Sequence, residues 1–249
     1  MNQVNLVTLD FGNSHARAAL FRRGELVAQA PAAELGTLLQ GQGLTAGDVN
    51  AVLCQVRPHP EVWDALVQQG LLVDKVADYW RGDKFAGMPV HYARTLGEDR
   101  LVAAWAAFKK FTTPTLVVDA GSFLTFDVVG PEGFLGGHIL PGLGKLSDAL
   151  SEGAQLSPRG FAGVGKELLR GDTLPHTTED ALGAAALAYA GLMQKMLLRW
   201  GVQQIVLTGG DAGIVHGWLR SLEHGVVLHV DPAWLPQALC EWHRRNISP

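Results

Sequence analysis

The chain has 249 residues, of which 47% are hydrophobic and 18% are charged, and its formal net charge is -4 at pH 7. This composition is typical of a globular protein with one or two domains, and it excludes a disordered chain or a strongly basic nucleic-acid-binding protein. Cys54 and Cys240 lie far apart in apolar segments, so we expect reduced thiols and no disulfide. The most apolar long segment, 181–193, is shorter than the about 20 residues that cross a bilayer. We therefore expect a cytoplasmic protein with no membrane or nucleic-acid partner.

The first half of the chain alternates short apolar runs with turn residues and helical patterns. The predicted strands cover residues 4–9, 17–21, 25–30, 49–56 and 71–76, and the predicted helices cover 34–40 and 60–69. Residues 80–89 contain two Gly and a Pro, and we expect them to form a loop. A helix is predicted over 101–111, and the Pro-containing segment that follows it marks the end of the first lobe.

The second half repeats this plan. Its predicted strands cover 115–118, 124–129, 134–139, 204–207 and 226–230, and its helices cover 145–152, 177–200, a segment after 213, and 233–244. Residues 157–175 are rich in Gly and Pro and are expected to form an extended surface loop. Because Asp10 and Asp119 lie at matching positions in the two halves, we predict an internal repeat. The predicted domains are lobes 1–113 and 114–249, in an α/β protein.

Each half contains a hairpin turn of the form Asp-x-Gly, at Asp10 to Gly12 and at Asp119 to Gly121. Gly permits close approach to backbone N–H groups, which can bind phosphate oxygens, while a neighbouring carboxylate suits a cation. A single Asp-Gly turn is common in ordinary hairpins, but two copies at equivalent positions favour a functional interpretation. Gly209 and Gly210, where a buried strand meets a helix, form a third candidate phosphate loop or a plain tight turn.

The segment Gly97 to Arg100 precedes the helix that ends the first lobe. An acidic residue beside an Arg is commonly a surface ion pair or a favourable charge at a helix start. In the functional interpretation, the carboxylate takes a proton from an alcohol and Arg100 binds a substrate carboxylate through two hydrogen bonds. The histidines are scattered without zinc-site spacing, so no zinc site is predicted.

Taken together, these segments resemble the type III pantothenate kinases, which belong to the superfamily of acetate and sugar kinases, the Hsp70 ATPase and actin. The matching segments follow the family's order along nearly the whole chain: Asp10–Ser14, Leu96–Arg100, Asp119–Asp127, Gly136–Gly142, Thr178 and Thr208–Ala212. The resemblance implies two related lobes of the actin/Hsp70-like ATPase fold, which is ribonuclease H-like, with a nucleotide cleft between them.

The resemblance also implies a role for each matching residue. Asp99 would be the general base on the primary hydroxyl of pantothenate. The substrate-binding residues would be Tyr92, Gly97, Glu98, Asp99, Arg100 and Thr178. The ATP-binding residues would be Asp10, Phe11, Gly12, Asn13, Ser14, His15, Ala16, Arg17 and Ser122. Asp119 would bind a monovalent cation, K⁺ or NH₄⁺. The family uses ATP with Mg²⁺, acts as a homodimer and makes the first intermediate of coenzyme A synthesis.

The chain departs from the family pattern in two places: Phe123 stands where the family has a small Ala, and the spacing from Tyr92 to Gly97 is shorter than in the family. Two other functions stay open from the sequence. One is a kinase for another small alcohol, and the other is a non-catalytic, nucleotide-binding regulatory relative of the same fold. Turnover with pantothenate would distinguish a pantothenate kinase from both alternatives.

Overall fold

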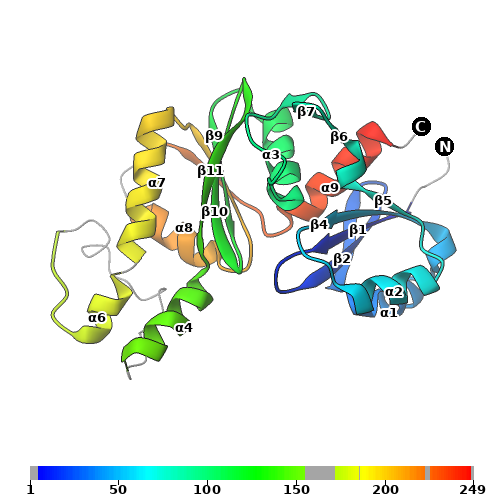
Figure 1. The fold of residues 1–249 in the computed structure, drawn as a ribbon, viewed down its shortest axis with the longest axis horizontal. Coiled ribbons are helices and arrows are strands. Elements are labelled where there is room, and N and C mark those ends of the chain that lie inside the picture. The colour runs from blue at the N-terminus through cyan, green and yellow to red at the C-terminus, as the bar shows by residue number, and fades with distance from the viewer. Residues whose placement is uncertain (1–4, 155–171, 185, 222–224, 248–249) are drawn as a thin grey trace. The chain divides into compact units, whose positions relative to one another are not determined.

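The computed structural model describes residues 5–154, 172–184, 186–221 and 225–247. The chain divides into two compact units (Figure 1). The first unit comprises Met1–Ala106 and Ala233–Pro249, and the second comprises Ala107–Pro232. The boundary between the units falls inside helix α3 (Glu98–Lys110). The packing units thus differ from a division at residue 113, since the last helix joins the first unit. The assignment of 1–113 and 114–249 as the two lobes stays a prediction.

The first unit contains a five-stranded sheet in the order β3-β2-β1-β4-β5. Its strands are β1 (Asn5–Phe11), β2 (Ala16–Arg22), β3 (Glu25–Pro31), β4 (Val49–Gln55) and β5 (Val73–Lys75). Strand β1 is antiparallel to β2 and parallel to β4, so β1 and β4 end at the same edge of the sheet. That edge carries the first Asp-Gly turn.

Both faces of this sheet are covered, which explains why β1 is a nearly continuous apolar run. Alternate residues of β1, including Val7 and Leu9, form one buried cluster with Leu35 and Leu39 of α1 (Leu35–Gly41). Leu66 of α2 (Pro60–Gln68) joins the same cluster. Helix α9 (Trp234–Asn246) packs against β1 and β4. Short 3₁₀ turns complete the unit: η1 (Ala32–Glu34), η2 (Ala46–Asp48) and η3 (Val76–Tyr79).

The loop prediction for residues 80–89 is wrong. These residues form a three-stranded antiparallel sheet of β6 (Trp80–Arg81), β7 (Lys84–Phe85) and β8 (Met88–Pro89). Each strand has only two residues, too few for an alternating hydrophobic pattern, and Gly82 and Gly87 adopt the positive φ of tight turns. The sheet is held from outside its own sequence, because the Trp242 ring of α9 stacks on Phe85 with 5.6 Å between ring centroids.

The second unit repeats the first sheet in the order β11-β10-β9-β12-β13. Its strands are β9 (Thr115–Ala120), β10 (Phe123–Gly130), β11 (Gly133–Pro141), β12 (Gln204–Thr208) and β13 (Val227–Val230). In the first sheet Asp10 pairs with Arg17 and Cys54, and in the second Asp119 pairs with Thr125 and Thr208. The two Asp residues therefore occupy equivalent register positions, as the internal repeat requires.

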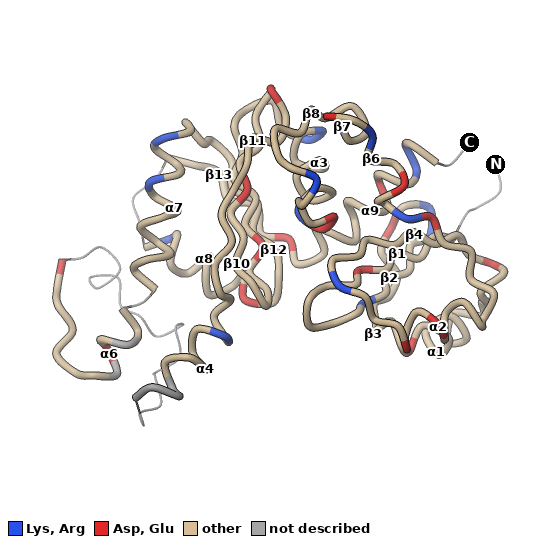
Figure 2. The backbone as a smooth tube through the Cα atoms, in the orientation of Figure 1, with Lys and Arg blue, Asp and Glu red and all other residues tan. Residues whose placement is uncertain are grey.

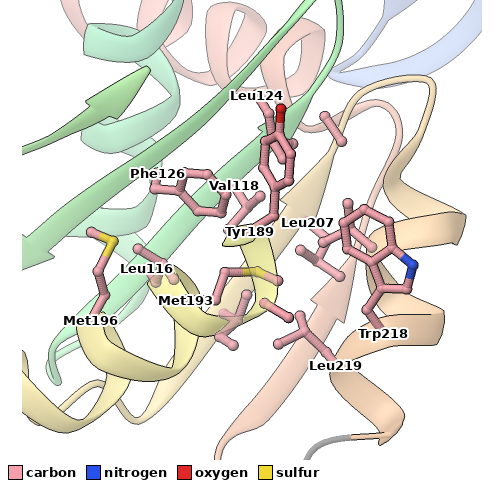
Figure 3. Close-up of a cluster of buried hydrophobic side chains, with 14 of the residues drawn as sticks. Leu116, Val118, Leu124, Phe126, Tyr189, Met193, Met196, Leu207, Trp218 and Leu219 are labelled. Carbon is pink, nitrogen blue, oxygen red and sulfur yellow. The ribbon is translucent and has the colours of Figure 1, made fainter. Parts of the chain in front are cut away.

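Helices cover one face of the second sheet (Figure 3). Met193 and Met196 of α7 (Ala186–Trp200) and Trp218 of α8 (Ala212–Ser221) join a buried cluster with Leu116 and Phe126 of the strands. The unit also contains α4 (Leu143–Ala154) and α6 (Thr178–Gly183). The single helix predicted over 177–200 is wrong in one respect: α6 and α7 are separate, with a turn at Ala184. Most of the predicted loop at 157–175 lies outside the described residues.

Acidic and basic residues are interspersed along the backbone of both units (Figure 2). Within the described ranges, no helix has the length and hydropathy needed to cross a membrane.

Candidate active site

The first Asp-Gly turn lies where β1 and β4 end. The Gly12 N–H donates to the carbonyl of His15 (N···O 3.0 Å), which closes the turn. The N–H groups of Val56 and Arg57 donate to the carbonyl of Phe11 at 2.9 and 3.2 Å, so the chain after β4 lies directly against the turn. Asn13, Ser14 and His15 at its tip are exposed. The turn therefore presents side-chain donors to solvent on a fixed backbone.

The start of α3 joins the same edge of the first sheet. The Glu98 carboxylate accepts a hydrogen bond from the Gln55 N–H at 2.9 Å, which fastens the helix to the end of β4. A Cβ atom at Gly97 would lie 2.5 Å from the Asp99 carboxylate, so any larger residue here would displace that carboxylate. The helix begins at Glu98, three residues earlier than predicted, and Glu98, Asp99 and Arg100 form its first turn.

Three of the predicted site carboxylates converge around one buried side chain in the first unit. The pKa of the Cys54 thiol is raised well above its ordinary value, first by burial and then by the negative charges of Asp10, Asp99 and Glu98. Asp10 comes from the β1 turn, whereas Asp99 and Glu98 come from α3. Sequence motifs separated by almost ninety residues therefore contribute to one acidic edge of the first unit.

Burial also raises the pKa values of the two α3 carboxyls. For Asp99 the largest cause is burial, and it outweighs the Arg100 N–H, which donates to Asp99 Oδ1 at 2.7 Å, and the Arg100 charge. For Glu98 the largest cause is again burial, partly offset by the Gln55 N–H. A carboxylate with a raised pKa is a stronger base than one in water, so Asp99 suits proton removal from an alcohol.

Arg100 is the buried cation of this edge, with 6% of its surface exposed. Its guanidinium carbon lies 5.6 Å from the centre of the Tyr92 ring, and Tyr92 itself is exposed. The predicted substrate residues Tyr92 and Arg100 are therefore in contact. They meet although only a short turn, closed by the Leu96 N–H and the Ala93 carbonyl at 3.1 Å, separates Tyr92 from Gly97.

The second Asp-Gly turn has its own tight surroundings in the second unit. Gly209 has φ +89°, and a Cβ atom there would overlap the Asp119 carboxylate and lie 2.5 Å from the Ala120 carbonyl oxygen. The Asp211 N–H donates to that same Ala120 carbonyl at 2.9 Å. The predicted Gly-Gly loop thus packs on the predicted cation residue. Burial raises the pKa of Asp211.

Ser122 and Thr178, two further predicted site residues, both belong to the second unit. Ser122 lies on the second turn with Asp119, whereas Thr178 is an exposed residue at the start of α6. The side chain that caps this helix is its neighbour Thr177, whose hydroxyl accepts from the Asp180 N–H at 3.1 Å. The part of the chain that the structure describes holds no group of three or more His, Cys, Asp or Glu placed to bind a metal ion.

Two contacts at these turns were missed by sequence reasoning. His59 Nε2 lies 2.8 Å from the Gly12 carbonyl oxygen, and Lys145 Nζ lies 3.7 Å from the centre of the Phe123 ring. In each contact the two residues are far apart in sequence. The only local signal for His59 is its place between two prolines directly after a buried strand.

The family model of type III pantothenate kinase matches residues 6–199, most of the chain. The chain belongs to the type III pantothenate kinase family. A type III pantothenate kinase of Rhodopirellula baltica is 38% identical over 128 residues, which cover 50% of this chain and 46% of that protein. One of Desulfosudis oleivorans is 28% identical over 238 residues, which cover 88% of this chain and 92% of that protein. The first four such relatives are matched over only 46% to 63% of their length.

Solved structures support the fold class of this pantothenate kinase family member. A Campylobacter jejuni protein assigned to the Baf family of transcriptional activators superposes with a TM-score of 0.63 at 20% identity, covering 96% of this chain and 98% of that one. A Sinorhizobium meliloti 2-dehydro-3-deoxygalactonokinase protein superposes with a TM-score of 0.61 at 15% identity, covering 98% and 97%. The predicted α/β fold is confirmed, since both solved structures share it over nearly the whole chain. The roles assigned to individual residues stay predictions.

Proposed function

We propose that this protein transfers the γ-phosphoryl group of ATP to the primary hydroxyl of pantothenate, forming 4'-phosphopantothenate and ADP. The observation that carries the proposal is the position of Asp99, in the first turn of α3, on the acidic edge that it shares with Asp10 of the β1 turn. Membership of the type III pantothenate kinase family supports the choice of substrate.

In this proposal each part of the first unit has one task. The turn 10–17 binds ATP through its backbone and exposed polar side chains. Asp99 removes the proton of the attacking hydroxyl, which typically contributes 10²–10⁴-fold to the rate. Arg100, buried and next to Tyr92, binds the pantothenate carboxylate, and Glu98 keeps α3 against β4. Phosphoryl transfer depends mainly on such positioning and on charge neutralisation.

The second unit would supply Ser122 to ATP, Thr178 to the substrate and Asp119 to a K⁺ or NH₄⁺ ion. The surroundings of Asp119 fit a hard cation, since its carboxylate lies beside the backbone of Gly209 and Ala120, where oxygen atoms are the available ligands. Mg²⁺ would accompany ATP and neutralise phosphate charge. Homodimer formation, which the resemblance to the family implies, and a cytoplasmic location, which the sequence composition predicts, belong to the same proposal.

The test is ADP release by the purified protein with Mg-ATP, with and without pantothenate, in potassium and in sodium buffer. We expect release that depends on pantothenate and is faster in potassium. ADP release that requires another small alcohol, and not pantothenate, would identify that alcohol as the substrate. No release with any of these acceptors, by protein that still binds ATP, would contradict the proposal and favour a nucleotide-binding regulatory function.

A further inference from the structure

Lys145 lies against an aromatic ring at the second Asp-Gly turn. Its Nζ atom is 3.7 Å from the centre of the Phe123 ring, and Phe123 directly follows Ser122 at the start of β10. A cation over the face of an aromatic ring is attracted by the ring's quadrupole. The contact therefore favours the position of the exposed Lys145 side chain over the Phe123 ring.

Backbone contacts fix where that place is. The Gly142 N–H donates to the Ser122 carbonyl at 3.1 Å, immediately before α4 begins. A Cβ atom at Gly142 would lie 2.8 Å from the Ser122 carbonyl carbon, so the two backbones are in direct contact. The Pro141 carbonyl in turn accepts from the Tyr189 hydroxyl at 2.8 Å, which anchors the segment to α7. The start of α4 thus brings Lys145 to the Ser122 turn.

The charge of Lys145 is unfavourable for α4 itself. Lys145 is in the first turn of this helix, where the positive end of the helix dipole favours an anion. Within the described residues Lys145 forms no ion pair, and its ammonium contacts the Phe123 ring. The Lys145 ammonium and the positive end of the α4 dipole both favour an anionic ligand at this location.

We propose that Phe123 is a platform that holds the Lys145 ammonium beside Ser122, where it binds the phosphate groups of the nucleotide. This inference rests on the proposed binding of ATP at the Ser122 turn. It gives Phe123 a function that the small Ala of the family cannot have, because Ala has no ring to hold the cation. The alternative is that Phe123 only fills space at the turn and hinders the nucleotide.

Nucleotide binding tests this without turnover. We would measure dissociation constants of ATP, ADP and AMP by calorimetry for the wild type, Lys145→Met, Lys145→Arg, Phe123→Ala and Phe123→Leu. Lys145→Met should weaken ATP binding about tenfold, AMP binding should change least, and Lys145→Arg should keep wild-type affinity. Phe123→Ala and Phe123→Leu should each weaken ATP binding about threefold. Lys195→Met, an exposed Lys on α7, is the matched control and should change nothing.

The sign of the Phe123 result separates the two explanations. Tighter ATP binding by Phe123→Ala would show hindrance and overturn the proposal. Wild-type ATP affinity in Lys145→Met would also overturn the proposal. An equal loss of affinity for AMP and ATP in that variant would overturn it as well. A wild-type protein that binds ATP through Lys145 but releases no ADP with pantothenate would leave this inference standing and refute only the proposed reaction. A wild type that binds no nucleotide would refute both.

Discussion

The Nε2 atom of His59 lies 2.8 Å from the carbonyl oxygen of Gly12, and the His59 ring packs edge-on against Phe11 with 5.4 Å between ring centroids. Since a carbonyl can only accept, Nε2 must carry a hydrogen in this contact. His59 therefore contacts the first Asp-Gly turn from the segment that follows β4, and we predict that it positions this turn.

Replacing His59 should weaken ATP binding more than pantothenate binding. A net hydrogen bond contributes about 0.5–1.5 kcal/mol, so His59→Ala should raise the KM for ATP about threefold to tenfold. His59→Gln, which keeps an N–H donor, should lose less. The measurement is steady-state kinetics with each substrate varied in turn. An unchanged KM for ATP in His59→Ala would show that the contact has no role in nucleotide binding.

Asp99→Asn should reduce kcat by 10²–10⁴-fold, because the amide cannot accept the hydroxyl proton. ATP affinity should stay within about twofold of the wild type, since Asp99 has no proposed contact with the nucleotide. Asp64→Asn, at an exposed position of α2, is the control and should keep full activity. Wild-type turnover in Asp99→Asn would exclude Asp99 as the base.

The same substitution should stabilise the protein at neutral pH. Burial raises the folded-state pKa of Asp99 above its ordinary value, so the folded state binds this proton more tightly than the unfolded state does. The stability associated with the protonated carboxyl is complete below about pH 4 and is lost as the pH rises through the raised pKa. Since Asn resembles the neutral carboxyl, Tm of Asp99→Asn minus that of the wild type should increase from pH 4 to pH 7. A difference that is constant with pH would contradict the raised pKa.

Gly209→Ala should destabilise the second unit. The left-handed backbone at this residue costs a side-chain-bearing residue about 1–2 kcal/mol, and the new Cβ would also overlap Asp119 and Ala120. Gly217→Ala in α8 is the matched control, because a Cβ atom at Gly217 would meet nothing within 4 Å. This substitution should increase the free energy of unfolding by about 0.5–1 kcal/mol. Urea unfolding of both variants gives the comparison. Equal stability of the two would show that the Gly209 turn adapts without cost.

Trp242→Ala should lower the free energy of unfolding by about 3–5 kcal/mol. Trp242 is fully buried in the first unit, stacked on Phe85 and edge-on to Tyr79 at a centroid distance of 5.2 Å. Trp200→Ala, on the second unit and 47% exposed, should cost much less. If the two variants unfolded at the same denaturant concentration, α9 would not be an integral part of the first unit.

Sequence by itself determined the elements whose signals are local. Apolar runs bounded by turn residues located the strands of both sheets, and the two Asp-Gly turns revealed a repeat that the matching strand orders bear out. The ordered motifs identified the family, because each depends on a short spacing. These features can be predicted from a single sequence because they depend on residues that are neighbours in the chain.

Only the tertiary structure decided the rest. The two-residue strands β6 to β8 are shorter than any hydrophobic period, and their stability comes from Trp242, more than 150 positions later. The packing of α9 in the first unit, the contact of His59 with Gly12 and that of Lys145 with Phe123 join residues far apart in the chain. Such contacts depend on how whole elements pack, and no periodicity or local motif encodes them.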